Sequence, residues 1–432
     1  MAPTSLPRLL TLRGAILLGL GSMIGTGVFV SLGLATSIAG SGVIVAVVIA
    51  ALVAACNGMS SAQLAASHPV SGGTYEYGYR YLTPTLGFLA GWTFLVAKSA
   101  SAATAAIGCV GYLLTAFGID GAYRAPSAVA VVLLFTALAA GGLQRSNRVN
   151  AALVAVTLLA LLAFIFLGAR SVDLDGSALD VDLFGARGLE TIFHAAALLF
   201  VAYTGYGRVA TLGEEVRDPR RTVPRAVIAV VAITMILYGA VALVALGDGG
   251  RGMTSAAVEG GAPLNASAES LGIGAIVPLL TVGAVTAMLG VLLNLLIGLS
   301  RVLLAMGRRG DMPARLARLN DAGTTPTAAV VGVGLGVAAL TLLDDVMATW
   351  SLSAFAVLIY YGITNVAALR LDARERFVPR IVAVAGLAAC LFLVVWIEES
   401  VMIAGAVVIA AGLVWRFGYR RVSARSESPP IS

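Results

Sequence analysis

One stretch decides the fold of this chain: Gly21-Ser22-Met23-Ile24-Gly25-Thr26-Gly27-Val28-Phe29, which interrupts a hydrophobic segment running from Leu12 to Ile38. Its three glycines and two hydroxyl residues stand where a membrane-spanning helix would otherwise continue. Backbone groups freed inside a bilayer must find partners, so unwound helix at that depth occurs only where it is buried in protein or lines a cavity. The amides freed at this break are therefore candidates for binding an anion.

The composition predicts an integral membrane protein. The chain has 432 residues, of which 59% are hydrophobic and 12% charged, and its mean hydropathy is +0.95. We expect an all-α protein with twelve transmembrane helices, because twelve segments are long enough to cross the hydrocarbon core. These segments are residues 12–38, 41–66, 84–117, 126–143, 149–169, 191–212, 224–247, 272–306, 326–343, 347–370, 378–396 and 400–418.

The distribution of arginine predicts the orientation, because cytoplasmic loops are rich in basic residues. With both termini inside, most arginines face the cytoplasm, whereas the opposite loops hold only Arg124, Arg170, Arg187 and Arg251 and collect acids. The first span lacks a cleavage site and is expected to be retained. The formal charge of +6 then reflects topology and lipid contact, not nucleic-acid binding. We expect a multi-pass protein of a bacterial plasma membrane.

A second interruption lies in the sixth span, at Ala202-Tyr203-Thr204-Gly205-Tyr206-Gly207, about five spans after the first. Paired breaks in corresponding positions suggest an inverted repeat. Transporters of that kind hold substrate between the breaks, with half-helix N-termini for anionic groups and freed carbonyls for cations. A small zwitterion matches this chemistry. Taken alone, the second break has an alternative interpretation as a glycine pair for close packing.

Four motifs in order resemble the amino acid-polyamine-organocation superfamily of transporters over nearly the whole chain. The first break resembles the first-helix signature of that family. The other three are Pro69-Val70-Ser71-Gly72-Gly73-Thr74-Tyr75, Gly205-Tyr206 with residues 214–226, and Ser300-Arg301-Val302-Leu303-Leu304-Ala305-Met306-Gly307-Arg308-Arg309-Gly310-Asp311-Met312-Pro313.

The resemblance implies a transport core of ten helices at residues 1–370, built from inverted repeats at about 12–169 and 191–370. Two additional helices would follow at 371–418, and a cytoplasmic tail at 419–432. It also implies substrate contacts at both breaks. The Thr26 and Gly27 amides with the Thr26 hydroxyl would take a carboxylate, and carbonyls would take an ammonium group. The carbonyls are those of Met23, Val201, Ala202 and Thr204; Ile24, Gly25, Tyr203 and Gly205 complete the expected site.

Lys98 is the only lysine of the chain and lies inside the third span. An intramembrane amine is costly unless neutralised, paired or hydrated, and lysine, unlike arginine, can lose its proton there. The chain also departs from many relatives by having Val201 at an expected aromatic gate and Thr157 at an expected coupling lysine. We therefore predict that Lys98 faces the substrate and titrates during transport. The alternatives are a snorkelling side chain or a buried cation that caps a broken helix.

The leading hypothesis is a secondary transporter of a small amino acid or related amine, working by alternating access and either proton-coupled or an exchanger. Neutral or acidic amino acids are favoured, because no acidic residue lies clearly inside the first, third, sixth or eighth span to offset a cationic substrate beside Lys98. A sodium symporter is an alternative, although Thr281 and Thr286 stand singly in the eighth span. A non-transporting amino acid sensor is another. We expect no enzyme activity, cofactor or metal site, and the three scattered cysteines indicate no disulfide framework.

Overall fold

The computed structural model describes residues 11–68, 72–142, 147–172, 188–208, 218–321 and 323–426, and this part of the chain contains helices but no β-strand. Nine helical segments are long and apolar enough to cross a membrane, and three shorter apolar helices accompany them. Each of the twelve ranges expected from hydropathy contains a helix. The helices within these ranges are α1 Leu12–Met23, α2 Leu32–Ala39, α3 Val43–Ser67, α5 Pro84–Phe117, α6 Arg124–Ala140, α7 Asn147–Gly168, α8 Gly188–Tyr203, α10 Pro219–Ala245, α13 Val277–Arg308, α14 Thr327–Thr341, α15 Val346–Leu369, α16 Arg380–Val394 and α17 Glu399–Ser426.

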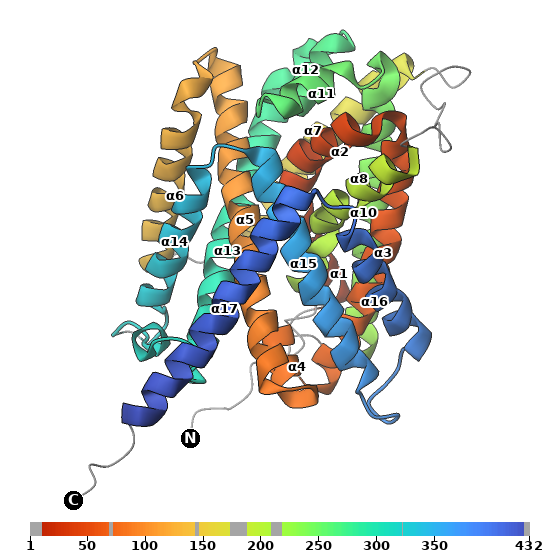
Figure 1. The fold of residues 1–432 in the computed structure, drawn as a ribbon. Coiled ribbons are helices and arrows are strands. Elements are labelled where there is room, and N and C mark those ends of the chain that lie inside the picture. Colours follow the sequence, from red (N-terminus) through yellow and green to blue (C-terminus); the bar gives the residue numbers. More distant parts are fainter. Residues whose placement is uncertain are drawn as a thin grey trace, which may run out of the picture.

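The helices form one upright bundle with short helices at its two ends (Figure 1). At one end α11 (Arg251–Val258) and α12 (Pro263–Ser270) form a hairpin, and at the other α4 (Thr74–Tyr81) turns beneath the bundle. These are called the α12 end and the α4 end below. Such short helices cannot cross the hydrocarbon core of a bilayer, and they lie instead at the ends of the bundle.

Helix α5 is central to the arrangement and packs against both α13 and α15. It begins where the Thr83 hydroxyl accepts a hydrogen bond from the Leu86 amide (3.2 Å) and Pro84 occupies the first turn, and it ends at Gly118 with a φ of +61°. These are the expected cap residues. Its buried face is rich in alanine, glycine, serine and threonine, which let neighbouring helices approach closely.

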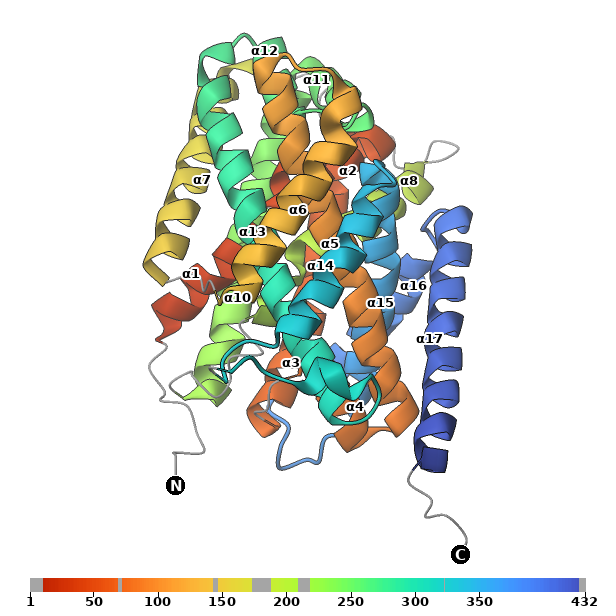
Figure 2. The same cartoon turned by 90° about the vertical axis from the view of Figure 1, so that its left-hand side faces the viewer.

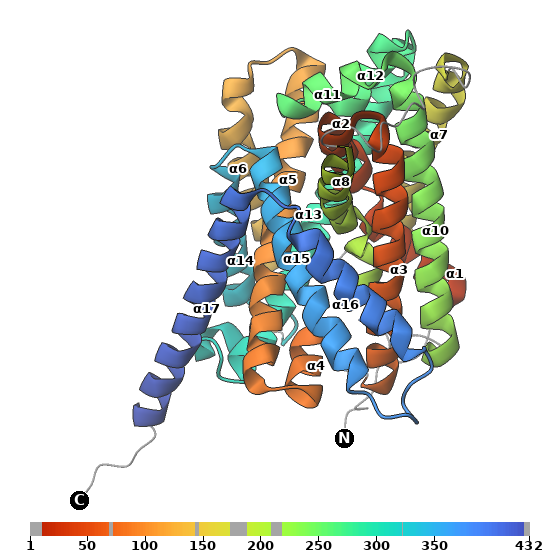
Figure 3. The same cartoon turned by 45° about the vertical axis from the view of Figure 1, so that its right-hand side comes forward.

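Helices α16 and α17 lie on the outside of the bundle, on either side of α15 (Figure 3). On the opposite flank α7 lies beside α1 and α13, far from α17 (Figure 2). Between these flanks a single large apolar core joins α1, α3, α5, α8, α10, α13 and α15. The two predicted interruptions lie within this core.

Candidate functional site

The first break begins where α1 ends at Met23. Ile24 has extended backbone angles (φ −78°, ψ 96°), and the chain then continues as a π-helix over Gly27–Ser31 before α2 begins. Both Val28 and Phe29 donate their amides to the Gly25 carbonyl at 3.2 Å. A π-turn inside a helix is common at functional sites. The interruption predicted from glycine and hydroxyl residues is therefore present in the structure.

The second break is tighter than an unwound segment. Helix α8 continues into a 3-10 turn over Thr204–Tyr206, which the amide of Gly207 closes. Such a tightened turn within a helix often marks a hinge. The cytoplasmic segment expected after this break, residues 209–217, lies outside the described residues, as do Pro69, Val70 and Ser71 of the second motif.

Glycines let the two breaks touch. A Cβ added to Gly205 would lie 2.5 Å from the Ser22 carbonyl oxygen, and one added to Gly27 would lie 2.7 Å from the Ala202 Cβ and 2.4 Å from the Tyr238 hydroxyl. Both glycines are thus required for close contact between protein segments. Gly25 faces another neighbour, because its Cβ would lie 2.7 Å from a methyl group of Val291 on α13.

Lys98 joins α5 to the second break. Its Nζ donates to the Thr204 hydroxyl at 2.7 Å, and that hydroxyl in turn donates to the Val201 carbonyl at 2.7 Å. None of the ion pairs found among the described residues involves Lys98. Further along α5, hydroxyl pairs link Ser101 to Ser353 (2.7 Å) and Thr104 to Thr349 (2.8 Å) on α15. Lys98 therefore lies on a polar side of α5 and points at the break.

The expected site residues are almost all buried, and two of the four expected carbonyls, those of Met23 and Val201, already have side-chain donors. The Thr26 hydroxyl is buried and has no hydrogen-bond partner among the described residues. The Met23 carbonyl accepts from the Tyr238 hydroxyl at 2.8 Å. Tyr203 turns away from the break, with its ring beside Tyr238 and its hydroxyl donating to Val47 of α3 at 3.4 Å. A polar group as buried and unpaired as Thr26 is a candidate ligand contact.

Tyr238 and Tyr112 are contacts that the sequence analysis missed. Tyr112 on α5 donates to the Phe29 carbonyl (2.9 Å) and accepts from the Leu264 amide of α12 (3.2 Å), so it ties the first break to the α12 end. Both are isolated tyrosines in apolar spans. A tyrosine isolated in an apolar span indicates a hydrogen bond, because a buried phenol needs a hydrogen-bond partner. The sequence does not identify that partner.

The threonines considered for sodium and proton coupling are engaged elsewhere. Thr281 accepts from Asn265 of α12 at 2.8 Å, and Thr286 donates to the Val282 carbonyl of its own helix at 2.7 Å. Thr157 is buried on α7 and donates to the Leu153 carbonyl at 2.8 Å. None of these three hydroxyls has a hydrogen bond to the first break. Separately, an apolar cavity of about 350 Å³ lies between α15, α16 and the start of α5.

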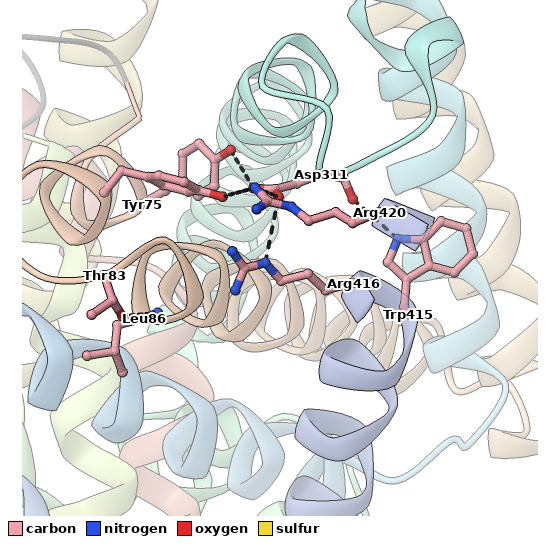
Figure 4. Close-up of polar contacts among 8 residues, drawn as sticks. Tyr75, Thr83, Leu86, Asp311, Trp415, Arg416 and Arg420 are labelled. Atoms are coloured by element: carbon pink, nitrogen blue, oxygen red, sulfur yellow. Dashed lines mark hydrogen bonds and ion pairs between the residues drawn. The ribbon is translucent and has the colours of Figure 1, made fainter. Parts of the chain in front are cut away.

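A second polar cluster lies at the α4 end (Figure 4). Asp311, which follows α13 and is fully buried, accepts from Tyr75 (2.9 Å) and Tyr79 (2.5 Å) of α4 and from Arg420 (3.1 Å) of α17. Arg416 lies 3.8 Å from the same carboxylate with only 3% of its side chain exposed. Burial, and then the hydrogen bond and charge of Asp311, raise the pKa of Tyr79 to about 12. Tyr79 thus remains a donor. Asp311 is part of a family-like motif, but sequence reasoning gave it no role.

Comparison with known proteins identifies similar chains. A model of the amino acid permease family matches residues 14–422. An uncharacterised transporter of Mycobacterium tuberculosis is 40% identical over 98% of this chain and 93% of its own length. A methylthioribose transporter and the branched-chain amino acid permease BcaP, both of Bacillus subtilis, are each 29% identical over 96% of this chain and 94% of their own lengths. These similar proteins are transporters and permeases, not enzymes.

Proposed function

The chain belongs to the amino acid permease family, as its motifs predict, and from this premise we propose that it is a secondary transporter of a small amino acid or related amine. It is a multi-pass membrane protein with the many apolar helices such transport requires. The proposed mechanism is alternating access, coupled to protons or run as an exchange. The observation that carries the proposal is the contact of two helix breaks with each other and with Lys98.

The proposed binding mode places the substrate at these breaks. The Thr26 hydroxyl and the Thr26 and Gly27 amides would take the carboxylate, because the break precedes the positive end of a half-helix. The end of α8, with the carbonyls of Val201 and Ala202, would take the ammonium group. Since the site residues are buried, substrate entry requires the surrounding elements to move. Neutral and acidic amino acids are favoured, because no acidic group pairs with Lys98 among the described residues.

The remaining architecture is part of the same proposal. The two repeats would cover residues 12–169 and 191–370, and α16 and α17 would be additions outside the ten-helix core, in keeping with their outer position (Figure 3). The α4 end would face the cytoplasm, because the arginines of the 301–318 and 370–380 segments gather there. The plasma membrane of a bacterium is the proposed location, in keeping with the bacterial relatives.

The test begins with substrate identity. The purified protein is screened for thermal stabilisation by each amino acid and by methylthioribose, because a ligand that binds only the folded state raises the melting temperature. The hit is then offered, labelled, to proteoliposomes. Accumulation driven by a pH gradient supports the proposal, and accumulation that needs a sodium gradient supports the symporter alternative. Binding without uptake supports the sensor alternative. Stabilisation by methylthioribose alone would overturn the amino acid assignment.

Lys98 is the proposed coupling residue. Lys98→Met and Lys98→Arg should both lose accumulation driven by a pH gradient, because methionine has no proton to exchange and arginine stays protonated. Lys98→Met should keep exchange of internal for external substrate if only coupling requires the amine. Accumulation by Lys98→Met with the pH dependence of the native protein would show that the amine is structural and merely caps α8.

A further inference from the structure

The position of Lys98 relative to α8 defines what its charge can do. Helix α8 ends at Tyr203, and its last turn presents carbonyl groups to the break. Lys98 reaches this end through Thr204, whose hydroxyl accepts from the amine and donates to the Val201 carbonyl, each at 2.7 Å. The C-terminus of a helix carries partial negative charge and favours a cation. The charged amine is therefore placed where α8 attracts a cation most strongly.

None of the ion pairs among the described residues lies at this end of α8, so a second cation there would lack a counter-charge. The other ionisable groups on the elements packed around α5 and η6 (Thr204–Tyr206) make contacts elsewhere or lie remote from the break. Tyr203 contacts Tyr238, and Tyr206 and Tyr360 pack on Tyr361. Arg208 points at Gly298 of α13. Glu190 and His194 lie in the first half of α8, away from its C-terminal end, and Cys109 and Tyr112 lie about three turns or more beyond Lys98 on α5. Further groups are Arg124 with Asp344, Glu76 with Arg309, Asp311 with Arg416 and Arg420, and Arg301 and Arg308, which are exposed near the α4 end of α13.

We infer that the protonated amine of Lys98 and the ammonium group of a zwitterionic substrate compete for the C-terminal end of α8. Binding of the zwitterion then releases the Lys98 proton to water: Lys98–NH₃⁺ becomes Lys98–NH₂, and the site keeps a single positive charge at this helix end. The inference rests on the proposed function and adds the direction of coupling. By linkage, a substrate that expels a proton binds more tightly as pH rises.

The competition predicts that two closely matched ligands favour opposite charge states of Lys98. An amino acid brings an ammonium group and should favour neutral Lys98. The carboxylic acid that lacks only the amino group brings a negative charge alone, and should favour charged Lys98 because unlike charges attract in a low-dielectric site. If Lys98 instead bound the substrate carboxylate, both ligands would bind more tightly at low pH.

The test is calorimetric titration of the purified full-length protein with L-leucine and with 4-methylpentanoate, its counterpart without the amino group. If the thermal screen selects a different amino acid, that amino acid and its deaminated acid replace the pair. Titrations in buffers of different ionisation enthalpy count the protons exchanged. We expect the amino acid to release up to one proton and to bind up to about tenfold more tightly per pH unit while Lys98 is charged. The deaminated acid should release none and bind more weakly as pH rises.

Two variants of Lys98 remove its ability to exchange a proton, one by making the side chain neutral and the other by keeping it permanently charged. Lys98→Gln should bind the amino acid with no proton release and no pH dependence. Lys98→Arg stays charged, so it should bind the amino acid without pH dependence and at least about tenfold more weakly than native protein at the high-pH end of the titration, where native protein binds most tightly, yet still bind the deaminated acid. That retained binding shows the variant is folded. Native protein that binds the amino acid with proton uptake, or with no proton exchange, overturns the inference alone. Native protein that binds no amino acid overturns the proposed function as well.

Discussion

At the scale of single residues, many polar side chains inside this apolar bundle bond to a backbone carbonyl of their own helix, and some pair with one another. Thr104 pairs with Thr349, and Ser101 pairs with Ser353. The hydroxyls of Thr26, Ser60, Ser267 and Tyr206 are buried and have no hydrogen-bond partner among the described residues, and of these Thr26 belongs to the first break. An unpaired buried hydroxyl costs free energy, and a ligand carboxylate would satisfy it. The position of this unpaired hydroxyl at the first break, between α1 and the π-helix, is the structural reason for placing the substrate carboxylate at Thr26.

Thr26→Ala should weaken substrate binding by about 1 to 3 kcal/mol, because the buried substrate carboxylate then loses a hydrogen-bond partner. The matched control is Thr36→Ala on α2, another buried threonine, whose hydroxyl donates to the Leu32 carbonyl of its own helix at 2.8 Å. The dissociation constant from calorimetry is the measurement. Equal affinity in the native protein and in Thr26→Ala would remove Thr26 from the site.

Gly205 tests whether the contact between the breaks is required. In Gly205→Ala the new Cβ would lie 2.5 Å from the Ser22 carbonyl oxygen, which belongs to backbone and cannot move aside easily. We expect a loss of stability of about 1 to 3 kcal/mol, as for overpacking, together with impaired transport. Gly239→Ala on α10 is the control, because nothing lies within 4 Å of its Cβ position. Melting temperature and uptake are measured for both, and equal behaviour of the two variants would contradict the close contact.

The sequence predicted part of the site at this scale. The breaks and the lone lysine were visible because glycine, hydroxyl and amine groups stand out in an apolar span. The direction of each side chain was not visible. Tyr203 points to Val47 of α3, and Tyr238 instead contacts the first break. The face that a helix turns toward each neighbour depends on the packing of several helices at once. That face cannot be predicted from the sequence when the helix has no clear polar side.

At the scale of elements, hydropathy found every long helix, because bilayer thickness sets a minimum length of apolar sequence. It missed α4, α11 and α12, each of eight residues, since short polar helices at the ends of a bundle obey no such requirement. Glycine and hydroxyl residues predicted two breaks in corresponding positions without giving their geometry, and the structure has a π-helix at the first and a 3-10 turn at the second.

Helix α17 is held at the α4 end by charge as well as by apolar packing. Its Arg416 is buried beside Asp311, with the guanidinium 5.4 Å from the centre of the Phe88 ring, and its Trp415 donates to the Asp311 backbone carbonyl at 3.3 Å. Asp311 thus joins three elements: α4, the end of α13, and α17 (Figure 4). A buried carboxylate with four polar neighbours is difficult to replace.

Asp311→Asn should destabilise the protein by about 3 to 5 kcal/mol, because it leaves the Arg416 charge buried without its counter-charge. Replacing both partners, in Asp311→Asn with Arg416→Met, should recover part of this loss. Asp218→Asn is the control, since Asp218 pairs with Arg221 on the surface, where both side chains are at least 60% exposed; it should change stability little. Thermal melting in one detergent compares them. A double variant no more stable than Asp311→Asn would show that the pair is not coupled.

At the scale of the whole molecule, contacts close both ends of the bundle around the buried site. The Asp311 cluster ties the α4 end. At the α12 end Arg124 of α6 donates to the Asp344 carboxylate (2.7 Å) and to the Glu259 carbonyl (2.5 Å), so it links α6, the α11–α12 hairpin and the start of α15. Asp344 has a φ of +48°, which an aspartate rarely adopts. Alternating access requires the contacts at one end to open while those at the other hold.

Arg124 is therefore expected to control opening at the α12 end. Arg124→Gln removes the charge from this tie and should shift the population toward a state in which the α11–α12 hairpin lifts. The hairpin covers Thr36, which is 3% exposed and whose hydroxyl lies 3.6 Å from the Met253 sulfur of α11. A cysteine placed there, with the three native cysteines replaced, reports the opening through its rate of reaction with a bulky thiol reagent.

The expected result is labelling of Thr36→Cys several-fold faster in the Arg124→Gln background than with Arg124 intact. Arg251→Gln is the matched control, because Arg251 begins α11 and is exposed, so this variant also removes one arginine charge at the α12 end but leaves the tie made by Arg124 in place. If substrate binding closes the site, saturating substrate should slow labelling in all three proteins. Equal rates for Arg124→Gln and Arg251→Gln would mean that the hairpin is held by its apolar contacts and that Arg124 serves only to neutralise Asp344.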